Sequence, residues 1–433
     1  MERKGLKQLL EWNTRQNRKP LIMYGARQVG KTWLMKAFAA KAFNKSVYIN
    51  FEDEERLTNL FEQDFDIDRI LATISLVLDT DINDDTLLIL DEIQAVKRGV
   101  TALKYFAEKA PHMHVIAAGS LLGIAQHRGD SFPVGKVDSF YLHPMDFEEF
   151  LLATGRQRMA DALRAQQWSV VNGSRELFEQ ALREYYFVGG MPAVVNSFIN
   201  DQNFDEVRRL QRDIIDNYER DFSKHAPNNE VPRIGMVWHS ILGQLAKENR
   251  KFIYGAIKEG GRAKEFELAI QWLTDAGLVH KVPRIKKGEL PLSAFEDFGA
   301  FKLFLLDVGL MCAMAGVSAT TVIEGNQLFS TAKGALTEQY VCQQLESLRD
   351  LFIGYWSADN SRGEIDFLIQ YGEKVIPIEV KAEENLKSKS LRVFVQNTPG
   401  LQGVRFSMSN YREQDWMTNY PLYCLPFVSE QWK

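Results

Sequence analysis

Apolar and polar positions alternate in blocks over residues 20–120, and the blocks predict strands and helices in turn. The segments between the short apolar runs have the length and pattern of helices. Because parallel strands need helical crossovers, and because a continuous run such as LLIL suits a strand buried on both faces, we predict an α/β fold with a parallel sheet covered by helices on both sides. The predicted strands are LIMYG (21–25), SVYINF (46–51), TLLILDE (86–92) and HVIAAGS (114–120).

The pattern changes twice further along the chain. Residues 145–235 are mostly helical, and the sequence VGGMP (188–192) is expected to end a helix or form a turn there. Residues 236–310 then read as two short helices followed by the strands LVHKVPRI and FKLFLLD around a KKGEL turn. Two helices and a hairpin in this order predict a winged helix-turn-helix.

A last domain follows a weakly patterned linker at residues 316–326. It begins with the helix GALTEQYVCQQLESL and continues with the strands LFIGYWS, EIDFLIQ and VIPIEVKA, with closing strands expected near 403–408 and 421–427. The chain therefore divides into four predicted parts. They are a P-loop-type core (1–160), a helical lid region (161–235), a winged-helix domain (236–315) and a C-terminal α/β domain (326–433).

Composition narrows the class of protein. A chain of 433 residues is too long for one core, and 45% hydrophobic with 25% charged residues is ordinary for a globular protein. The net charge of −5 means that any nucleic-acid binding must come from local patches. The three cysteines form no CxxC pair, which excludes a zinc knuckle and is typical of a reducing compartment. No uncharged apolar run approaches the roughly 18 residues of a membrane span. We therefore expect a cytoplasmic protein with no membrane partner.

The first chemical motif is GARQVGKT, which lies after an apolar strand and before a helix. It matches G-x-x-x-x-G-K-[ST], whose loop amides and helix N-terminus surround phosphate oxygens. Lys31 can neutralise phosphate charge and Thr32 can offer its hydroxyl to Mg²⁺. The alternative is a chance glycine-rich turn before a helix. The expected nucleotide-contacting residues are Gly25, Ala26, Arg27, Gln28, Val29, Gly30, Lys31, Thr32, Trp33 and Ser120.

The second half of the motif is the end of TLLILDE. Asp91 ends a buried strand, where an unpaired carboxylate would cost free energy without a cation. It can hold Mg²⁺ through water, while Glu92 can polarise the attacking water as a catalytic residue beside Lys31. Ser120, at the tip of the next strand, is either a γ-phosphate sensor or a strand-end cap. The predicted cofactors are ATP and Mg²⁺.

Seven sequence blocks carry a family resemblance: GARQVGKT, YINFE, LDEIQ, AAGSLLG, PVGKVDSFYLHPMDFEEFL, YFVGGMP and FKLFLLDVGL. They resemble the AAA-type ATPases of bacteria and archaea that carry a C-terminal domain of unknown function with a nuclease-like fold. The resemblance implies ATP binding, hydrolysis and assembly with further copies of the chain. Many relatives have arginine where this chain has Lys136, and lysine lacks the planar two-point contact with phosphate. Arg128 and Arg262 are the alternative charge-stabilising candidates, or surface arginines.

The second chemical motif lies in SRGEIDFLIQYGEKVIPIEVKA. It places Asp366 before a turn at Gly372, and Glu379 and Lys381 after it; the last two face one side because strands have a period of two. Glu338 lies on the helix upstream. Such a set would place two or three carboxylates around Mg²⁺ or Mn²⁺, with lysine orienting a water.

This arrangement resembles the PD-(D/E)XK nuclease superfamily. The resemblance implies that Glu338, Asp366, Glu379 and Lys381 are catalytic, with Asp366 and Glu379 as metal ligands. One hypothesis is then an ATPase coupled to a nuclease acting on DNA or RNA. Another is an ATP-driven switch or scaffold whose C-terminal domain cuts nothing, and a third is a small-molecule P-loop kinase. The basic residues of the expected winged helix either contact phosphates or form a solvated rim or a lid; they are Arg262, Lys264, Arg284, Lys286 and Lys287.

Overall fold

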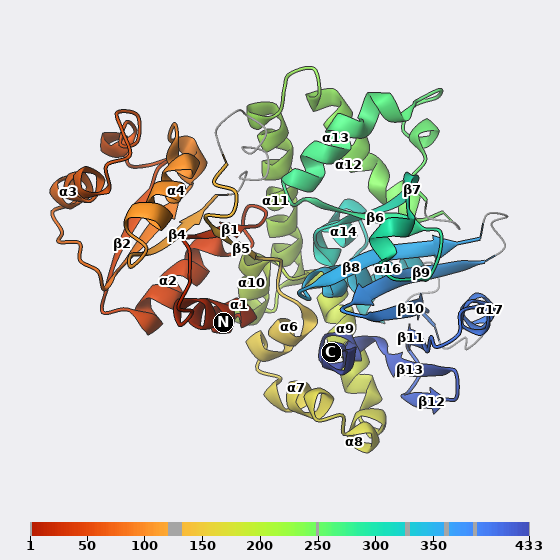
Figure 1. Ribbon diagram of the computed structural model, residues 1–433. Coiled ribbons are helices and arrows are strands. Elements are labelled where there is room, and N and C mark those ends of the chain that lie inside the picture. The colour runs from red at the N-terminus through yellow and green to blue at the C-terminus, as the bar shows by residue number, and fades with distance from the viewer. Residues whose placement is uncertain are drawn as a thin grey trace. The chain divides into compact units, whose positions relative to one another are not determined.

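The computed structural model describes residues 2–119, 132–247, 251–324, 330–358, 363–383 and 388–432. The chain forms two compact units, which are described separately below and are coloured by residue number in Figure 1. The N-terminal unit spans residues 2–143 with 275–277, and the C-terminal unit spans residues 144–274 with 278–433. Within the part of the chain described, no helix is long and apolar enough to cross a membrane.

A five-stranded parallel sheet forms the centre of the N-terminal unit, in the order β2-β3-β4-β1-β5. The four predicted strands are present, and the parallel sheet is confirmed. The fifth strand, β5, was not predicted, because its sequence DSFY lies at the sheet edge with one buried side chain and has no apolar run. The strands are β1 (Leu21–Tyr24), β2 (Lys45–Asn50), β3 (Thr86–Asp91), β4 (His114–Ala118) and β5 (Asp138–Tyr141).

Helices cover both faces of this sheet. Alternate strand residues such as Ile22 and Leu88 share one core with residues of α3 (Ile67–Leu78) and α4 (Gly99–Lys109). The helices α1 (Lys4–Asn13) and α2 (Lys31–Ala42) contact each other, and α2 contacts β3 and β4, outside that core. Because β3 is buried along its whole length, it carries apolar residues at nearly every position and ends in a carboxylate.

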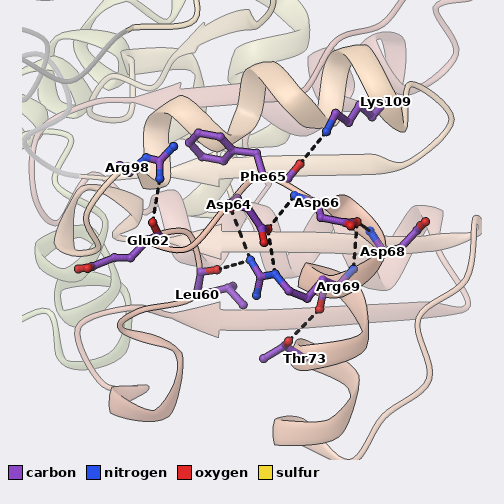
Figure 2. A network of polar contacts seen from close by, with 10 residues as sticks. All are labelled: Leu60, Glu62, Asp64, Phe65, Asp66, Asp68, Arg69, Thr73, Arg98 and Lys109. Atoms are coloured by element: carbon purple, nitrogen blue, oxygen red, sulfur yellow. Dashed lines mark hydrogen bonds and ion pairs between the residues drawn. The ribbon is translucent and has the colours of Figure 1, made fainter.

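A polar network fixes the connection between β2 and α3 (Figure 2). Asp66 caps α3 by accepting hydrogen bonds from the backbone of its first turn, and Arg69 pairs with Asp64 at 2.9 Å. The guanidinium of Arg98 donates to the carbonyl of Glu62 and lies 4.1 Å from the ring centre of Phe65. These contacts attach the connection to the start of α4, so the segment that follows β2 has a defined course.

The C-terminal unit begins with helices, as the sequence predicted for residues 145–235. Helix α9 ends and α10 begins within the sequence VGGMP, as predicted. A β-carbon on Gly190 would lie 2.0 Å from the carbonyl oxygen of Met145, so only glycine allows the close approach at this turn. The helices of this part are α6 (Phe147–Ala153), α7 (Gln157–Arg164), α8 (Trp168–Gly173), α9 (Arg175–Val188), α10 (Pro192–Asp201) and α11 (Phe204–His225).

The rest of this unit is built around an eight-stranded sheet in the order β12-β13-β11-β10-β9-β8-β6-β7. Its strands are β6 (Val279–Ile285), β7 (Glu296–Leu305), β8 (Leu351–Ser357), β9 (Glu364–Tyr371), β10 (Lys374–Val380), β11 (Gly403–Ser407), β12 (Arg412–Gln414) and β13 (Met417–Pro421). The remaining helices are α12 (Val231–Leu245), α13 (Ala263–Asp275), α14 (Val308–Met314), α15 (Ala319–Glu324), α16 (Ser330–Glu346), α17 (Lys389–Asn397) and α18 (Leu425–Val428).

The predicted sequence of two helices and a hairpin is present as α12, α13 and β6–β7, but the hairpin is not a separate wing. Strand β6 also pairs in parallel with β8, through Arg284 with Tyr355 and Ile285 with Trp356, so the hairpin extends the C-terminal sheet. The winged helix is therefore not confirmed, and the four domain boundaries stay predictions.

Two segments of the C-terminal region differ in detail from the predicted pattern. The strand expected near 421–427 lies earlier, as β13, which ends at Pro421. The residues that follow form a 3₁₀ turn (Leu422–Cys424) and α18, and Pro426 has no N–H for a strand ladder. Within the expected linker at 316–326, residues 319–324 form α15.

Candidate functional site

The loop between β1 and α2 has the backbone of a phosphate cradle. Gly25 has φ of +145° and a β-carbon there would lie 2.4 Å from the carbonyl oxygen of Leu142, so no other residue fits. Gly30 has φ of +95° and directly precedes the first turn of α2. The loop therefore closes around the N-terminus of α2, where unpaired amides and the helix dipole favour an anion.

Lys31 is buried at the start of α2. Its ammonium donates to the carbonyl oxygens of Gly25 at 2.7 Å and Ala26 at 2.9 Å, across the loop. Burial lowers the pKa of Lys31 from 10.5 to about 8, while the charges of Glu92 and Asp91 oppose that shift. A phosphate at the loop would stabilise the charged form of this lysine.

Thr32 and Asp91, the two residues that the sequence predicted to hold Mg²⁺, are in direct contact. The Thr32 hydroxyl donates to Oδ2 of Asp91 at 2.7 Å, and Asp91 is 3% exposed at the end of β3. The Tyr48 hydroxyl donates to the same oxygen at 2.9 Å, and the backbone N–H of Glu92 donates to Oδ1 at 3.1 Å. Burial and the Asp91 charge raise the pKa of Tyr48 above its usual range, so the phenol keeps its proton.

Glu92 follows β3 in a left-handed backbone conformation, with φ of 50° and ψ of 43°. This left-handed conformation ends the extended backbone of β3 directly after Asp91. The amide of Gln94 donates to Oε2 of Glu92 at 2.5 Å. The Glu92 carboxylate follows Asp91, which with Thr32 is predicted to hold magnesium. It is held in place by the side chain of Gln94.

Arg3 supports the loop from outside the motif and was not singled out from the sequence. Its guanidinium donates to the carbonyl oxygen of Val29 at 2.9 Å and to that of His143 at 2.7 Å, and it is 6% exposed. Arg3 therefore ties the phosphate loop to the segment after β5. Its only sequence signal is a charged residue just before an amphipathic helix, which is too common to interpret.

The other predicted residues of this unit have less defined surroundings. Arg27 pairs with Glu52 at 3.7 Å, and Trp33 is 48% exposed on α2. Lys136, the residue at the position of the family arginine, pairs with Glu108 at 3.0 Å. Ser120 and Arg128 lie outside the described residues.

In the C-terminal unit, Asp366 and Glu379 lie across from each other on paired strands. The register that pairs Ile378 with Phe367 places Glu379 opposite Asp366 on one face of the sheet. Oδ2 of Asp366 accepts a hydrogen bond from the backbone N–H of Val380 at 2.7 Å. Both side chains come from the strands that the sequence predicted.

Charged neighbours surround this carboxylate pair. Lys381 lies 2.5 Å from Oε1 of Glu379, and Arg405 of β11 is the cross-strand partner of Glu379 on the other side. Burial, and then the charge of Asp366, raise the pKa of Glu379 to about 7. The guanidinium of Arg405 is buried and donates to Asn419 at 2.7 Å, a contact that the sequence did not indicate.

Glu338 has a different partner from the one that the sequence suggested. It is buried on α16, and its Oε2 lies 3.7 Å from the ammonium of Lys302, which also lies 2.5 Å from Glu364. Across the ranges that the structure covers, no group of three or more His, Cys, Asp or Glu side chains is placed to hold a metal ion. The available signal was Lys302 itself, a single charge within the apolar strand FKLFLL.

The basic residues of the hairpin are only partly available to a ligand. The guanidinium of Arg284 donates to the carbonyl oxygen of Ser357 at 2.6 Å and pairs with Asp297 at 3.2 Å. Lys286 and Lys287 are exposed, as are Arg262, which precedes α13, and Lys264 in its first turn. The Arg284 side chain is therefore occupied by contacts with neighbouring strands, whereas the other four basic side chains are exposed to solvent.

Three family models match separate parts of the chain. Residues 17–151 match an AAA domain, residues 179–321 match a domain of unknown function (DUF8612), and residues 333–425 match another domain of unknown function (DUF4143). No curated protein matches the chain.

Solved structures that match the chain include three with low identity and TM-scores below 0.5. The Walker-type ATPase paby2304 of Pyrococcus abyssi is 14% identical, with 72% of this chain and 95% of that chain covered and a TM-score of 0.45. The Aeropyrum pernix ORC1 protein, solved in complex with DNA, is 13% identical, with 72% and 91% covered and a TM-score of 0.29. The STAND protein PH0952 of Pyrococcus horikoshii, which has a tetratricopeptide repeat sensor, is 15% identical, with 80% and 45% covered and a TM-score of 0.28.

The AAA domain match covers the motif and the strands that carry it. Within those residues, a glycine loop precedes α2, and Thr32 contacts the carboxylate at the end of a buried parallel strand. Residues 17–151 are therefore similar to an AAA domain, and they carry the phosphate-type loop described above.

Proposed function

We propose that the chain binds ATP and hydrolyses it with Mg²⁺. The observation that carries this proposal is the 2.7 Å contact between Thr32 and Asp91, beside the buried ammonium of Lys31. A hydroxyl and a carboxylate are hard oxygen donors of the kind that Mg²⁺ prefers. Because Mg²⁺ usually keeps several bound waters, it needs only a small number of protein ligands. The donor set therefore fits MgATP.

Each residue has a distinct role in the proposed reaction. The amides of the loop 25–32 and the N-terminus of α2 hold phosphate oxygens, and Lys31 neutralises charge on the β- and γ-phosphates. Thr32 would hold Mg²⁺ directly and Asp91 through water, and the ion would draw charge from the phosphates. Glu92 orients and polarises the attacking water, for which the Gln94 contact must open or rearrange. Trp33 and Ser120 complete the proposed nucleotide contacts.

Two substitutions separate nucleotide binding from hydrolysis. Lys31→Ala should lose most of its affinity for ATP, while Glu92→Gln should bind ATP and turn it over at least about 100-fold more slowly, because a general base contributes roughly that factor. Lys41→Ala, an exposed lysine of the same helix, is the matched control and should behave as the wild type. Equal turnover by the wild type and Glu92→Gln would remove Glu92 from the mechanism.

We further propose that the C-terminal unit acts on nucleic acid. Support comes from Asp366 and Glu379, two carboxylates opposite each other on paired strands, with Lys381 at 2.5 Å from Glu379. Two carboxylates can hold a divalent cation, which would polarise a phosphodiester, and a lysine can orient water. The alternative is a switch or scaffold whose C-terminal unit binds a partner without cutting. A second copy of the chain is a proposed partner under either alternative.

One assay distinguishes these alternatives. ATP hydrolysis is measured with Mg²⁺, with and without single- and double-stranded DNA or RNA, and the nucleic acid is followed on a gel. Stimulated hydrolysis with cutting that Asp366→Ala abolishes, while ATP turnover persists, supports the nuclease. Hydrolysis indifferent to nucleic acid, with the strands intact, supports the switch or scaffold.

A further inference from the structure

One tryptophan of the chain is exposed, and it lies directly beside the phosphate loop. All eight tryptophans belong to the described residues, and Trp33 is the single exposed one among them, with an exposed fraction of 48%. It stands in the first turn of α2, immediately after Thr32. Because single apolar side chains are common on protein surfaces, the position of Trp33 and its surroundings must show whether it has a function.

The first three side chains of α2 lie in different directions. The Lys31 ammonium donates to carbonyl oxygens of the loop, and the Thr32 hydroxyl donates to Asp91 at the end of β3. Successive residues of a helix are rotated by about 100°, and the next side chain, Trp33, is exposed on the outer side of α2. Side chains of a helix lean toward its N-terminus, so the indole lies over the turn that adjoins the loop.

The exposed part of this indole has no aromatic or polar partner among the described residues. Lys36 and Ala37 follow three and four positions later, where side chains of a helix are neighbours. The Lys36 ammonium lies instead 4.1 Å from the ring centre of Tyr48, and the methyl group of Ala37 is too short to cover an indole. Within the part of the chain that the structure describes, Trp33 has no ring contact and no hydrogen bond.

The proposed triphosphate site determines which ligand can reach the indole. Its metal end lies at Thr32 and Asp91, next to the β- and γ-phosphates, so the nucleoside lies at the opposite end of the triphosphate. Asp91 is 3% exposed, and the sheet leaves no room for a ribose and a base on that side. The nucleoside therefore extends toward the exposed side of α2, where Trp33 lies. A nucleobase has flat π faces on which aromatic side chains stack.

We infer that Trp33 is the base-stacking residue of the nucleotide site, with the indole against a face of the nucleobase. The inference rests on the proposed binding of ATP and adds the residue that contacts its base. Lys31 and the loop amides then hold the phosphates, while Trp33 adds affinity that a ligand without a base cannot gain.

The first test compares ADP with pyrophosphate, both with Mg²⁺, by isothermal titration of the full chain. ADP carries a base and is not a substrate of the proposed hydrolysis, whereas pyrophosphate has the phosphates alone. Trp33→Ala should weaken ADP binding about 10-fold or more and leave pyrophosphate binding within about 2-fold, because only ADP loses a stacked base. Trp33→Phe should recover most of the affinity for ADP, since phenylalanine keeps a π face.

Leu76→Ala is the matched control, because Leu76 is an exposed apolar residue of α3, and it should bind both ligands as the wild type does. Equal affinity for ADP in the wild type and Trp33→Ala would overturn the inference. An equal loss for ADP and pyrophosphate would also overturn it, because Trp33 would then support the phosphate loop and not the base.

The second test follows the indole itself. The difference in fluorescence between the wild type and Trp33→Phe reports Trp33, and its quenching by acrylamide measures how exposed the indole is. ADP should shield Trp33 from acrylamide, whereas pyrophosphate should leave it as exposed as before. Shielding that depends on the protein concentration and not on ADP would assign the indole to a contact between copies of the chain and overturn the inference.

The two tests separate the inference from the proposed function. If ADP binds and shields Trp33 but ATP is not hydrolysed, the proposed hydrolysis fails and the stacking role stands. If the wild type binds ADP and pyrophosphate equally well, the base contributes nothing, so the inference fails while the phosphate-binding role of Lys31 stands. Binding of neither ligand would overturn both.

Discussion

The hydroxyl of Tyr48 lies 2.9 Å from Oδ2 of Asp91, the oxygen that also accepts the Thr32 hydroxyl. Tyr48 belongs to β2, and β2 pairs with β3 in parallel along the whole of both strands, which brings the phenol to the carboxylate. An oxygen with two donors has a fixed orientation. Tyr48 is therefore a positioning residue for Asp91 in the proposed reaction.

Tyr48→Phe should raise the Mg²⁺ concentration for half-maximal ATP hydrolysis by about 10-fold, because a hydrogen bond to a carboxylate contributes about 1.5–3 kcal/mol. Affinity for ATP without Mg²⁺ should stay the same, since Tyr48 contacts Asp91 and not the phosphate loop. The measurement is a magnesium titration of the hydrolysis rate, with Tyr105→Phe on α4 as the control. An unchanged or lowered magnesium requirement would contradict the positioning role.

Arg3 offers a test of the loop's support. Arg3→Ala removes the two hydrogen bonds to the carbonyl oxygens of Val29 and His143 and leaves buried acceptors. We expect ATP affinity to fall about 10-fold or more, with a smaller effect on turnover at saturating ATP, because the cradle loosens while Glu92 is untouched. Equilibrium binding of a fluorescent ATP analogue measures this, and Lys7→Ala, in the same helix α1, is the control. Wild-type affinity in Arg3→Ala would show that the loop holds its shape alone.

The sequence predicted the parts of the site that depend on short spacing. Lys31 and Thr32 follow the loop directly, and Asp91 ends an apolar run, so a strand, a turn and a helix suffice to place them. Tyr48 could not be predicted, because its contact depends on the neighbouring position of β2 and β3 in the sheet. The role of Arg3 could not be predicted for the same reason, because its partners lie 26 and 140 residues away in the chain.

The C-terminal unit shows a similar division. The paired strands around Gly372 were predicted, because alternation and a glycine turn define a hairpin locally. The partner of Glu338 was not predicted, because Lys302 lies on a strand that the sequence assigned to another domain. The parallel pairing of β6 with β8 joins those two regions into one sheet, and pairing between distant strands has no local signal.

A substitution at Asp307 would test how much the buried polar network contributes to the stability of the C-terminal unit. Its buried carboxylate accepts hydrogen bonds from the N–H groups of Gly190 at 2.6 Å and Leu310 at 2.9 Å, and from the amide of Gln343 at 3.1 Å. Asp307→Asn replaces an acceptor by a donor facing these donors, so we expect a loss of about 2–4 kcal/mol in the free energy of unfolding of this unit. Urea unfolding with Asp201→Asn, at the exposed end of α10, as the control measures it. A change below about 1 kcal/mol would mean that the network rearranges without cost.

The last prediction follows from the pKa of Lys31, which burial lowers to about 8. Between that value and the ordinary 10.5, the unfolded chain binds one more proton than the folded chain, so Lys31 makes the free energy of unfolding rise with pH in this window. Bound ATP favours the protonated form of Lys31, because its phosphates stabilise the charged ammonium. Binding at pH 8.5–9 should therefore take up close to one proton, and at pH 7 almost none. Calorimetry in buffers of different ionisation enthalpy measures this uptake, and Lys31→Arg should abolish it, since arginine stays charged. Equal proton uptake by the wild type and Lys31→Arg would mean that another group titrates on binding.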